Sequence, residues 1–105
     1  MTTRKVLRRR RAWADIDAAI DHYSSAGEQV AIGFIDALDA ALDLMVAYPQ
    51  AGSSRHDDDA ELKGLRFRPL DRYPYLIFYF DLGDTIDVWR VLHASVDIPR
   101  HLSGS

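Results

Sequence analysis

Hydrophobic positions in the first half of the chain recur at helical spacing. From Ala12 onward, large apolar side chains return every three or four residues, as on one face of a helix: Trp13, Ile16, Ala19, Ile20 and Tyr23. This face predicts a first helix, with Trp13 and Tyr23 expected in the core. Residues 24–27 (SSAG) end it, and Ser25 followed by Glu28 has the spacing of a capping box. A second helix is therefore predicted to begin at this point.

The second helix has the clearest pattern in the chain. One face is apolar, with Val30, Phe34, Leu38, Ala41, Leu42 and Met45. The other face is acidic, with Asp36, Asp39 and Asp43. Pro49 is expected to end the helix, because the residue before a proline is driven out of helical geometry. Since only a few residues join the two helices, they are predicted to pack antiparallel as a hairpin.

Alternation and apolar runs replace helical spacing in the second half. Strands are predicted over residues 63–68, 75–80 and 86–92, and residues 81–84 form a hairpin loop with Gly83. Residues 3–10 predict a short N-terminal strand. Short loops imply antiparallel neighbours. The expected fold class is therefore α+β: an N-terminal strand and an antiparallel two-helix hairpin packed on a small antiparallel sheet of three to four strands.

The strand over residues 75–80 (YLIFYF) is apolar on both faces. Tyr75, Ile77 and Tyr79 point opposite to Leu76, Phe78 and Phe80. One helix hairpin covers one face, so the other is left for a partner, and Tyr75 and Tyr79 are expected on that open face. The alternative is that the tail, residues 95–105, folds back over it.

Composition places the chain among ordinary globular proteins. Its 105 residues suit one domain, residues 1–105, with a short flexible tail from about residue 98. Hydrophobic residues make up 48% and charged residues 28%, which argues against disorder. No cysteine is present, which excludes a disulfide framework and fits a cytoplasmic protein. Neither a secretory signal nor a membrane-spanning run is recognised, so no membrane association is expected.

The net charge of −3 is unevenly distributed. The run Arg8–Arg11 is interpreted as surface charge, neutralised at helical spacing as in Arg11 with Asp15. A second basic set is Lys63, Arg66, Arg68 and Arg72. It fits a solvated strand edge, an acidic partner segment or a phosphate backbone equally. His56 and Asp57–Asp59 are interpreted as an acidic loop and not as a metal site, and no metal or cofactor is expected.

Three segments carry a resemblance to a known family. Residues 34–52 (FIDALDAALDLMVAYPQAG), 64–80 (GLRFRPLDRYPYLIFYF) and 86–102 (IDVWRVLHASVDIPRHL) resemble ParE-type toxins of the RelE/ParE superfamily. The resemblance runs from about Arg4 to Leu102. Its most specific part is residues 91–95 (VLHAS) followed by Asp97.

The resemblance implies a toxin of a type II toxin–antitoxin system, of the kind associated with plasmid stabilisation. It implies neutralisation by a ParD-like antitoxin, whose ribbon-helix-helix domain binds operator DNA, so that the toxin meets operator DNA only indirectly. ParE members poison DNA gyrase, so action by binding, without catalytic residues, is expected. Candidate contacts to antitoxin or target are Arg66, Arg68, Arg72, Tyr75, Tyr79, Trp89, Arg90 and His93.

Two alternatives stay open at this point. A RelE-like, ribosome-dependent mRNA interferase needs a base, an acid and cations for phosphate. Arg66 and Arg68 match the first basic pair, but Leu76 stands where a further arginine is expected, and no tyrosine follows Tyr79. Arginine is a poor base near neutral pH, which leaves His93 or His101 to supply the proton. The second alternative is a non-toxic member that only forms the antitoxin complex.

Overall fold

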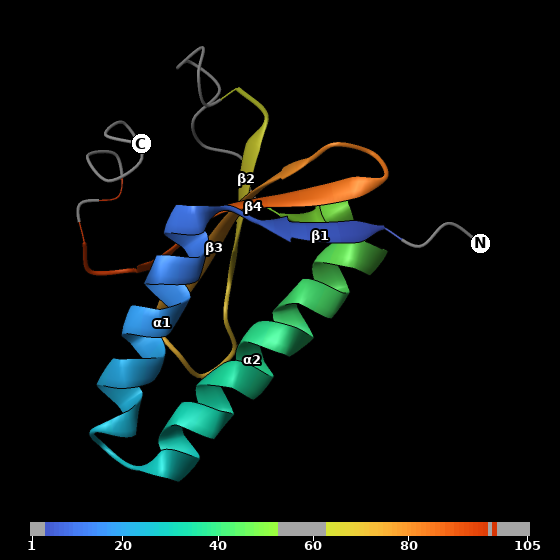
Figure 1. Ribbon diagram of the computed structural model, residues 1–105. Coiled ribbons are helices and arrows are strands. Elements are labelled where there is room, and N and C mark those ends of the chain that lie inside the picture. The colour runs from blue at the N-terminus through green and yellow to red at the C-terminus, as the bar shows by residue number, and fades with distance from the viewer. Residues whose placement is uncertain (1–3, 53–62, 97, 99–105) are drawn as a thin grey trace.

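The computed structural model describes residues 4–52, 63–96 and 98, and it has a helix hairpin beside a four-stranded sheet (Figure 1). In chain order the elements are β1 (Lys5–Arg8), α1 (Arg10–Ser24), α2 (Glu28–Ala47), a short 3₁₀ turn η1 (Pro49–Ala51), β2 (Leu65–Pro69), β3 (Tyr75–Asp81) and β4 (Thr85–His93). The predicted α+β architecture is confirmed, including the helix hairpin and the loop that joins β3 to β4.

The sheet is mixed rather than wholly antiparallel. Its strand order is β1-β4-β3-β2, so β3 and β4 are central and β2 and β1 lie at the edges. The pairs β2–β3 and β3–β4 are antiparallel, as their short connections predict. β1 joins β4 in parallel, which the sequence prediction had wrong. Since no short loop joins β1 to β4, nothing local requires these two strands to run in opposite directions.

Helix α1 begins before the residue expected and buries its small side chains. Ala12, Ile16 and Ala19 form its buried face. Trp13, predicted in the core, is 48% exposed, and the guanidinium of Arg8 lies 5.0 Å from its ring centroid. Ala12 takes the position against the sheet, which turns its neighbour Trp13 outward. Tyr23 does pack against the core, with ring centroids 5.5 Å from Phe34 and 5.0 Å from Tyr73.

Helix α2 starts without the predicted capping box. Its N-cap is Gly27, whose φ of 147° is one that side-chain-bearing residues rarely adopt. The hydroxyl of Ser25 instead donates a hydrogen bond to the carbonyl of His22 at 2.7 Å. The helix ends at Ala47, just before Pro49 as predicted. Its buried face is Ala31, Phe34, Leu38, Ala41, Leu42 and Met45.

Val30 was wrongly predicted to lie on the buried face of α2. It is 37% exposed, and Ala31 takes its place in the core. The predicted acidic face is confirmed, because Asp36, Asp39 and Asp43 are all exposed. Val30 is thus one of several large apolar side chains that α2 exposes to solvent.

Two apolar clusters lie on opposite faces of the sheet. The larger one, beneath the helices, includes Phe34, Met45, Ile77, Tyr79, Ile86 and Val88. The smaller one, on the other face, is built on Leu65, Phe78 and Leu92. Both faces of β3 are therefore apolar as predicted. Ile77 and Tyr79 face the helices, while Leu76, Phe78 and Phe80 belong to the second face.

The second face is partly covered by the chain that follows β4. Val96 and Ile98 pack against its cluster, which supports the alternative that the tail folds back. The rest of the predicted flexible tail, residue 97 and residues 99–105, lies outside the described residues. Phe67, Leu76, Phe80 and Trp89 remain half-buried, so this face is not the bare surface that the strand pattern suggested.

An ion pair fixes α1 to the central strand β4. Asp15 accepts hydrogen bonds from Nε and Nη2 of Arg90 at 2.7 and 2.9 Å, and from the backbone N–H of Val91 at 3.0 Å. The two side chains are only 14% and 10% exposed. Asp15, which the sequence suggested as the neutraliser of Arg11, thus has both carboxylate oxygens engaged by Arg90.

Candidate partner-binding surface

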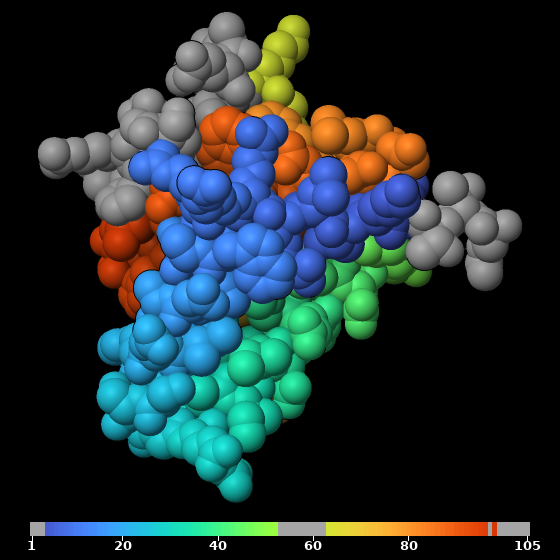
Figure 2. Space-filling model, in the orientation of Figure 1, coloured from blue at the N-terminus to red at the C-terminus, as the bar shows by residue number. Residues whose placement is uncertain are grey.

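Helix α2 presents large apolar side chains to solvent. Val30, Ile32, Ile35 and Leu44 are between 36% and 49% exposed, and Tyr48, directly after the helix, is 64% exposed. In the space-filling view, α2 forms one outer flank of the molecule, from turquoise to green (Figure 2). Leu44 among them also lines a groove, and exposed apolar surface at a groove is typical of a protein-binding site.

A groove of about 410 Å³ runs between α2 and the end of the edge strand β2. Its lining comes from two elements: Ala37, Ala40, Ala41 and Leu44 on α2, and Arg68, Pro69, Leu70 and Asp71 at the end of β2. The groove is open along the helix because the side chains of the three alanines project little beyond the helix backbone. One cation and one carboxylate, Arg68 and Asp71, also line it. An apolar segment with charged flanks fits such a groove.

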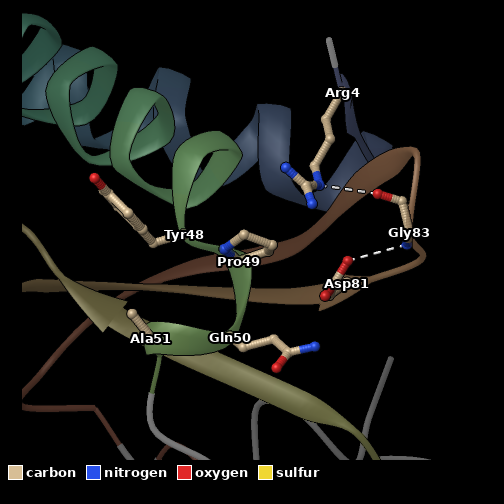
Figure 3. Close-up of a pocket in the computed structure, with 7 residues that line it drawn as sticks. All are labelled: Arg4, Tyr48, Pro49, Gln50, Ala51, Asp81 and Gly83. Atoms are coloured by element: carbon tan, nitrogen blue, oxygen red, sulfur yellow. Dashed lines mark hydrogen bonds between the residues drawn. The ribbon is translucent and has the colours of Figure 1, made fainter. Parts of the chain in front are cut away.

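A second hollow, of about 510 Å³, lies where α2, β1 and the β3–β4 hairpin meet (Figure 3). The guanidinium of Arg4 donates hydrogen bonds to the carbonyls of Gly83 at 2.9 Å and Val46 at 2.7 Å. Asp81 accepts one from the backbone N–H of Gly83 at 3.0 Å. Arg4 therefore ties the end of α2 to the β3–β4 hairpin, Asp81 stabilises the hairpin loop itself, and we assign this hollow a structural role.

Tyr75 and Tyr79, predicted as partner anchors on an open face, lie on the face that the helices cover. Tyr79 is fully buried, and its hydroxyl donates to the carbonyl of Pro49 at 2.8 Å. Burial raises the pKa of its hydroxyl. Tyr75 is half-buried, with ring centroids 5.3 Å from Phe34 and 5.1 Å from His93. The prediction of their orientation was wrong, and both residues stabilise the core.

Removing the Tyr79 hydroxyl is expected to destabilise the fold. Tyr79→Phe leaves the buried carbonyl of Pro49 without this donor, which should lower the free energy of unfolding by about 1 to 2 kcal/mol. Tyr73→Phe is the matched control, because the Tyr73 hydroxyl also donates to a helix carbonyl, that of Val30, but at an exposed position. Urea unfolding measures both variants. Equal stabilities for the two would contradict the assigned role of Tyr79.

Arg66 and Arg90 are engaged inside the protein. Nη1 of Arg66 donates to the carbonyls of Gln50 at 3.1 Å and Gly52 at 2.9 Å, tying β2 to the turn after α2. Arg90 is 8% exposed, and its hydrogen bonds to Asp15 raise its pKa. Arg90 was expected at the rim of a groove, paired with acidic residues of a partner. The structure contradicts this, because its guanidinium is directed to Asp15 of the same chain.

Comparison with known proteins decides the family. The family model described as "ParE toxin of type II toxin-antitoxin system, parDE" matches residues 6–98. The chain belongs to the ParE toxin family. A solved structure titled "Chromosomal ParDE TA system from P. aeruginosa" contains a similar chain, with a TM-score of 0.71 and 22% identity, over 89% of this chain and 98% of that one. A search of curated proteins finds no match.

The other four residues predicted to contact an antitoxin or target, Arg68, Arg72, Trp89 and His93, are spread over this ParE-family structure and form no single site. Arg68 lines the α2–β2 groove. Arg72 is exposed nearby, with a φ of 72° that is uncommon for a residue with a side chain. Trp89 belongs to the cluster on the second face of the sheet. Nδ1 of His93 accepts a hydrogen bond from the backbone N–H of Ser95 at 3.0 Å.

The groove residues on α2 were missed by sequence reasoning. Ala37, Ala40 and Leu44 follow helical spacing next to the buried face, and that spacing was the available signal, whereas Ala41 was predicted on the buried face itself. Alanine gives little indication of whether it is buried in a core or lines a groove.

Within residues 4–52, 63–96 and 98, no group of His, Asp or Glu side chains is placed to hold a metal ion. The His56–Asp59 loop lies outside the described residues. No described helix is long and apolar enough to cross a membrane.

Proposed function

We propose that this ParE-family toxin is neutralised by direct binding of a ParD-like antitoxin, and that unbound toxin inhibits DNA gyrase. The observation that carries the antitoxin proposal is the groove beside α2, which the exposed apolar side chain of Leu44 lines. Membership of the ParE family supports gyrase as the target. The similar solved chain comes from a ParDE system, which supports a ParD-like partner.

The groove suits an apolar segment of the antitoxin. A segment laid along Ala37, Ala40 and Leu44 would remove apolar surface from water, which is the main source of affinity in helix-in-groove recognition. Arg68 can pair with an acidic residue of that segment. A pair at the rim of an interface adds only about 0.2 to 1 kcal/mol and acts mostly on the association rate.

Action by binding, rather than by RNA cleavage, is supported by the state of the candidate catalytic groups. Arg66, which matches a phosphate-binding position of the RelE-like alternative, donates to two backbone carbonyls. His93 has Nδ1 engaged by Ser95. We therefore propose that the protein is not an enzyme.

Controlled expression in a bacterial host tests the function. Expression is expected to induce the DNA-damage response and filamentation, and co-expression of the antitoxin encoded beside the gene should restore growth. Transcript mapping should show no codon-periodic mRNA cuts. Ribosome-dependent cleavage that is lost in an Arg66→Ala, Arg68→Ala variant, still folded by circular dichroism, would establish the interferase alternative.

A further inference from the structure

The loop that joins β2 to β3 is held against helix α2 (Figure 1). At the start of the loop, Leu70 is buried, and its backbone N–H donates a hydrogen bond to the carbonyl of Tyr75 at 2.9 Å. Near the end of the loop, the hydroxyl of Tyr73 donates to the carbonyl of Val30 on α2 at 2.9 Å. Gly33 makes room for this contact, because a Cβ at that position would collide with the Tyr73 hydroxyl. Both ends of the loop are therefore fixed.

Arg72, between these two anchors, has a strained backbone. In the part of the chain that the structure describes, it is the only residue other than glycine with a positive φ, which is 72°. A side chain is unfavourable at such a φ, whereas glycine adopts it without that penalty. Strain of this kind persists only where the surrounding structure enforces it, and it is concentrated at functional sites. Glycine would form this turn at lower energy, which points to a use for the arginine side chain itself.

Arg72 lies at one end of the groove between α2 and β2. It is exposed, and it directly follows Arg68–Asp71, the four residues that line the groove on the side of β2. The chain from β2 into the loop runs along α2 from the end of the helix toward its start. Arg66 donates to carbonyls in the turn after α2, whereas Tyr73 donates to Val30 in the first turn of the helix. Arg72 is therefore at the end of the groove nearest the start of α2.

The chemistry along the groove changes from apolar to basic. On the side of α2 its lining is apolar, from Ala37 to Leu44. On the side of β2, Arg68 lines the groove and Arg72 borders its end, with one carboxylate, Asp71, between them. A guanidinium binds a carboxylate through two parallel N–H bonds. An apolar segment with an acidic residue beyond its apolar part fits this arrangement of side chains.

We propose that Arg72 determines which antitoxin the groove accepts, by pairing with an acidic side chain that follows the apolar part of the antitoxin segment. This rests on the proposed binding of antitoxin in the groove, and it adds a direction: the acidic residue lies toward the start of α2. The fixed loop holds the Arg72 backbone in place before the partner arrives, so less conformational freedom is lost on binding. An antitoxin with a basic residue at the same position would be repelled, which gives discrimination between antitoxins.

Binding of full-length toxin variants to the antitoxin encoded beside the gene provides the test, with rates from surface plasmon resonance. Arg72→Glu reverses the charge at the proposed contact. Lys63→Glu is the matched control, because it changes the net charge equally at an exposed position outside the groove lining. Arg72→Gly removes the guanidinium and the backbone strain together. In the antitoxin, each acidic residue of the toxin-binding segment is changed in turn to lysine and measured against the Arg72→Glu toxin.

Arg72→Glu is expected to lower the affinity at least about tenfold, mainly through slower association, whereas Lys63→Glu should stay within about twofold of the wild type. One of the lysine variants of the antitoxin should restore binding to the Arg72→Glu toxin. Arg72→Gly should bind more weakly than the wild type, although its melting temperature should be no lower, because glycine relieves the strained φ.

Equal losses for Arg72→Glu and Lys63→Glu would overturn the role of Arg72, since both would then reflect net charge alone. The pairing with a carboxylate would be refuted if no lysine variant of the antitoxin restored binding. A lower melting temperature for Arg72→Gly would show that the arginine serves the fold. If Leu44→Glu weakened binding and Arg72→Glu did not, the groove would stand and only the role of Arg72 would fall. Wild-type toxin that failed to bind the antitoxin would overturn both.

Discussion

Replacing Asp15 by alanine is expected to lower the free energy of unfolding by about 3 to 5 kcal/mol, the range found when one partner of a buried ion pair is removed. The carboxylate accepts two bonds from Arg90 and one from the Val91 N–H. Its loss removes the carboxylate that pairs with the Arg90 guanidinium at a site that is only 8% exposed, between α1 and β4. A domain of this size has a total stability of about 5 to 15 kcal/mol, so much of it depends on this contact.

Asp17→Ala is the matched control for that experiment. Asp17 lies on the same helix but is exposed, so its removal should change the stability by less than about 0.5 kcal/mol. Urea unfolding followed by circular dichroism measures both variants. An Asp15→Ala protein as stable as the Asp17→Ala protein would show that the ion pair contributes nothing to the fold.

Leu44→Glu is expected to weaken antitoxin binding at least about 30-fold while the toxin stays folded. Leu44 is 44% exposed and lines the α2–β2 groove, so a charge is tolerated in the free toxin. In the complex that charge would be buried against apolar atoms, and disruption of a central interface position commonly costs 2 kcal/mol or more. Isothermal titration of purified toxin with its antitoxin gives the affinity.

Ile32→Glu distinguishes the groove from α2 as a whole. Ile32 is 49% exposed on the same helix, but it lies about 120° around the axis from Leu44 and does not line the groove. Its replacement should leave the affinity within about threefold. If the two variants lost equal affinity, or if Leu44→Glu bound normally, the antitoxin would have to be placed on another surface.

Sequence periodicity predicted the elements of this fold but not how each face is used. In β3 the alternation correctly separated Tyr75, Ile77 and Tyr79 from Leu76, Phe78 and Phe80. Alternation does not say which of two apolar faces meets the helices. The buried bond from the Tyr79 hydroxyl to the Pro49 carbonyl identifies the helix face, and it depends on where α2 ends.

The sites were harder to predict than the fold, because the position of a charged residue in the sequence does not indicate which group its side chain will contact. Arg66, Arg68 and Arg90 look alike in the sequence, yet Arg66 ties β2 to the turn after α2, Arg68 lines a groove, and Arg90 is nearly buried. Their partners are set by the tertiary fold, as with Asp15, which lies far from Arg90 along the chain. The parallel pairing of β1 with β4 was missed for the same reason, since no local connection joins them.

Purified gyrase provides the most direct test of the proposed function. Relaxed plasmid, ATP and gyrase are incubated with the toxin, and the reaction is stopped with detergent and protease so that trapped breaks appear as linear DNA. We predict that toxin causes linear DNA to accumulate and supercoiling to fall, and that toxin premixed with its antitoxin has neither effect. Normal supercoiling without breaks, at toxin concentrations above that of gyrase, would contradict the proposal that this ParE-family protein acts by binding gyrase.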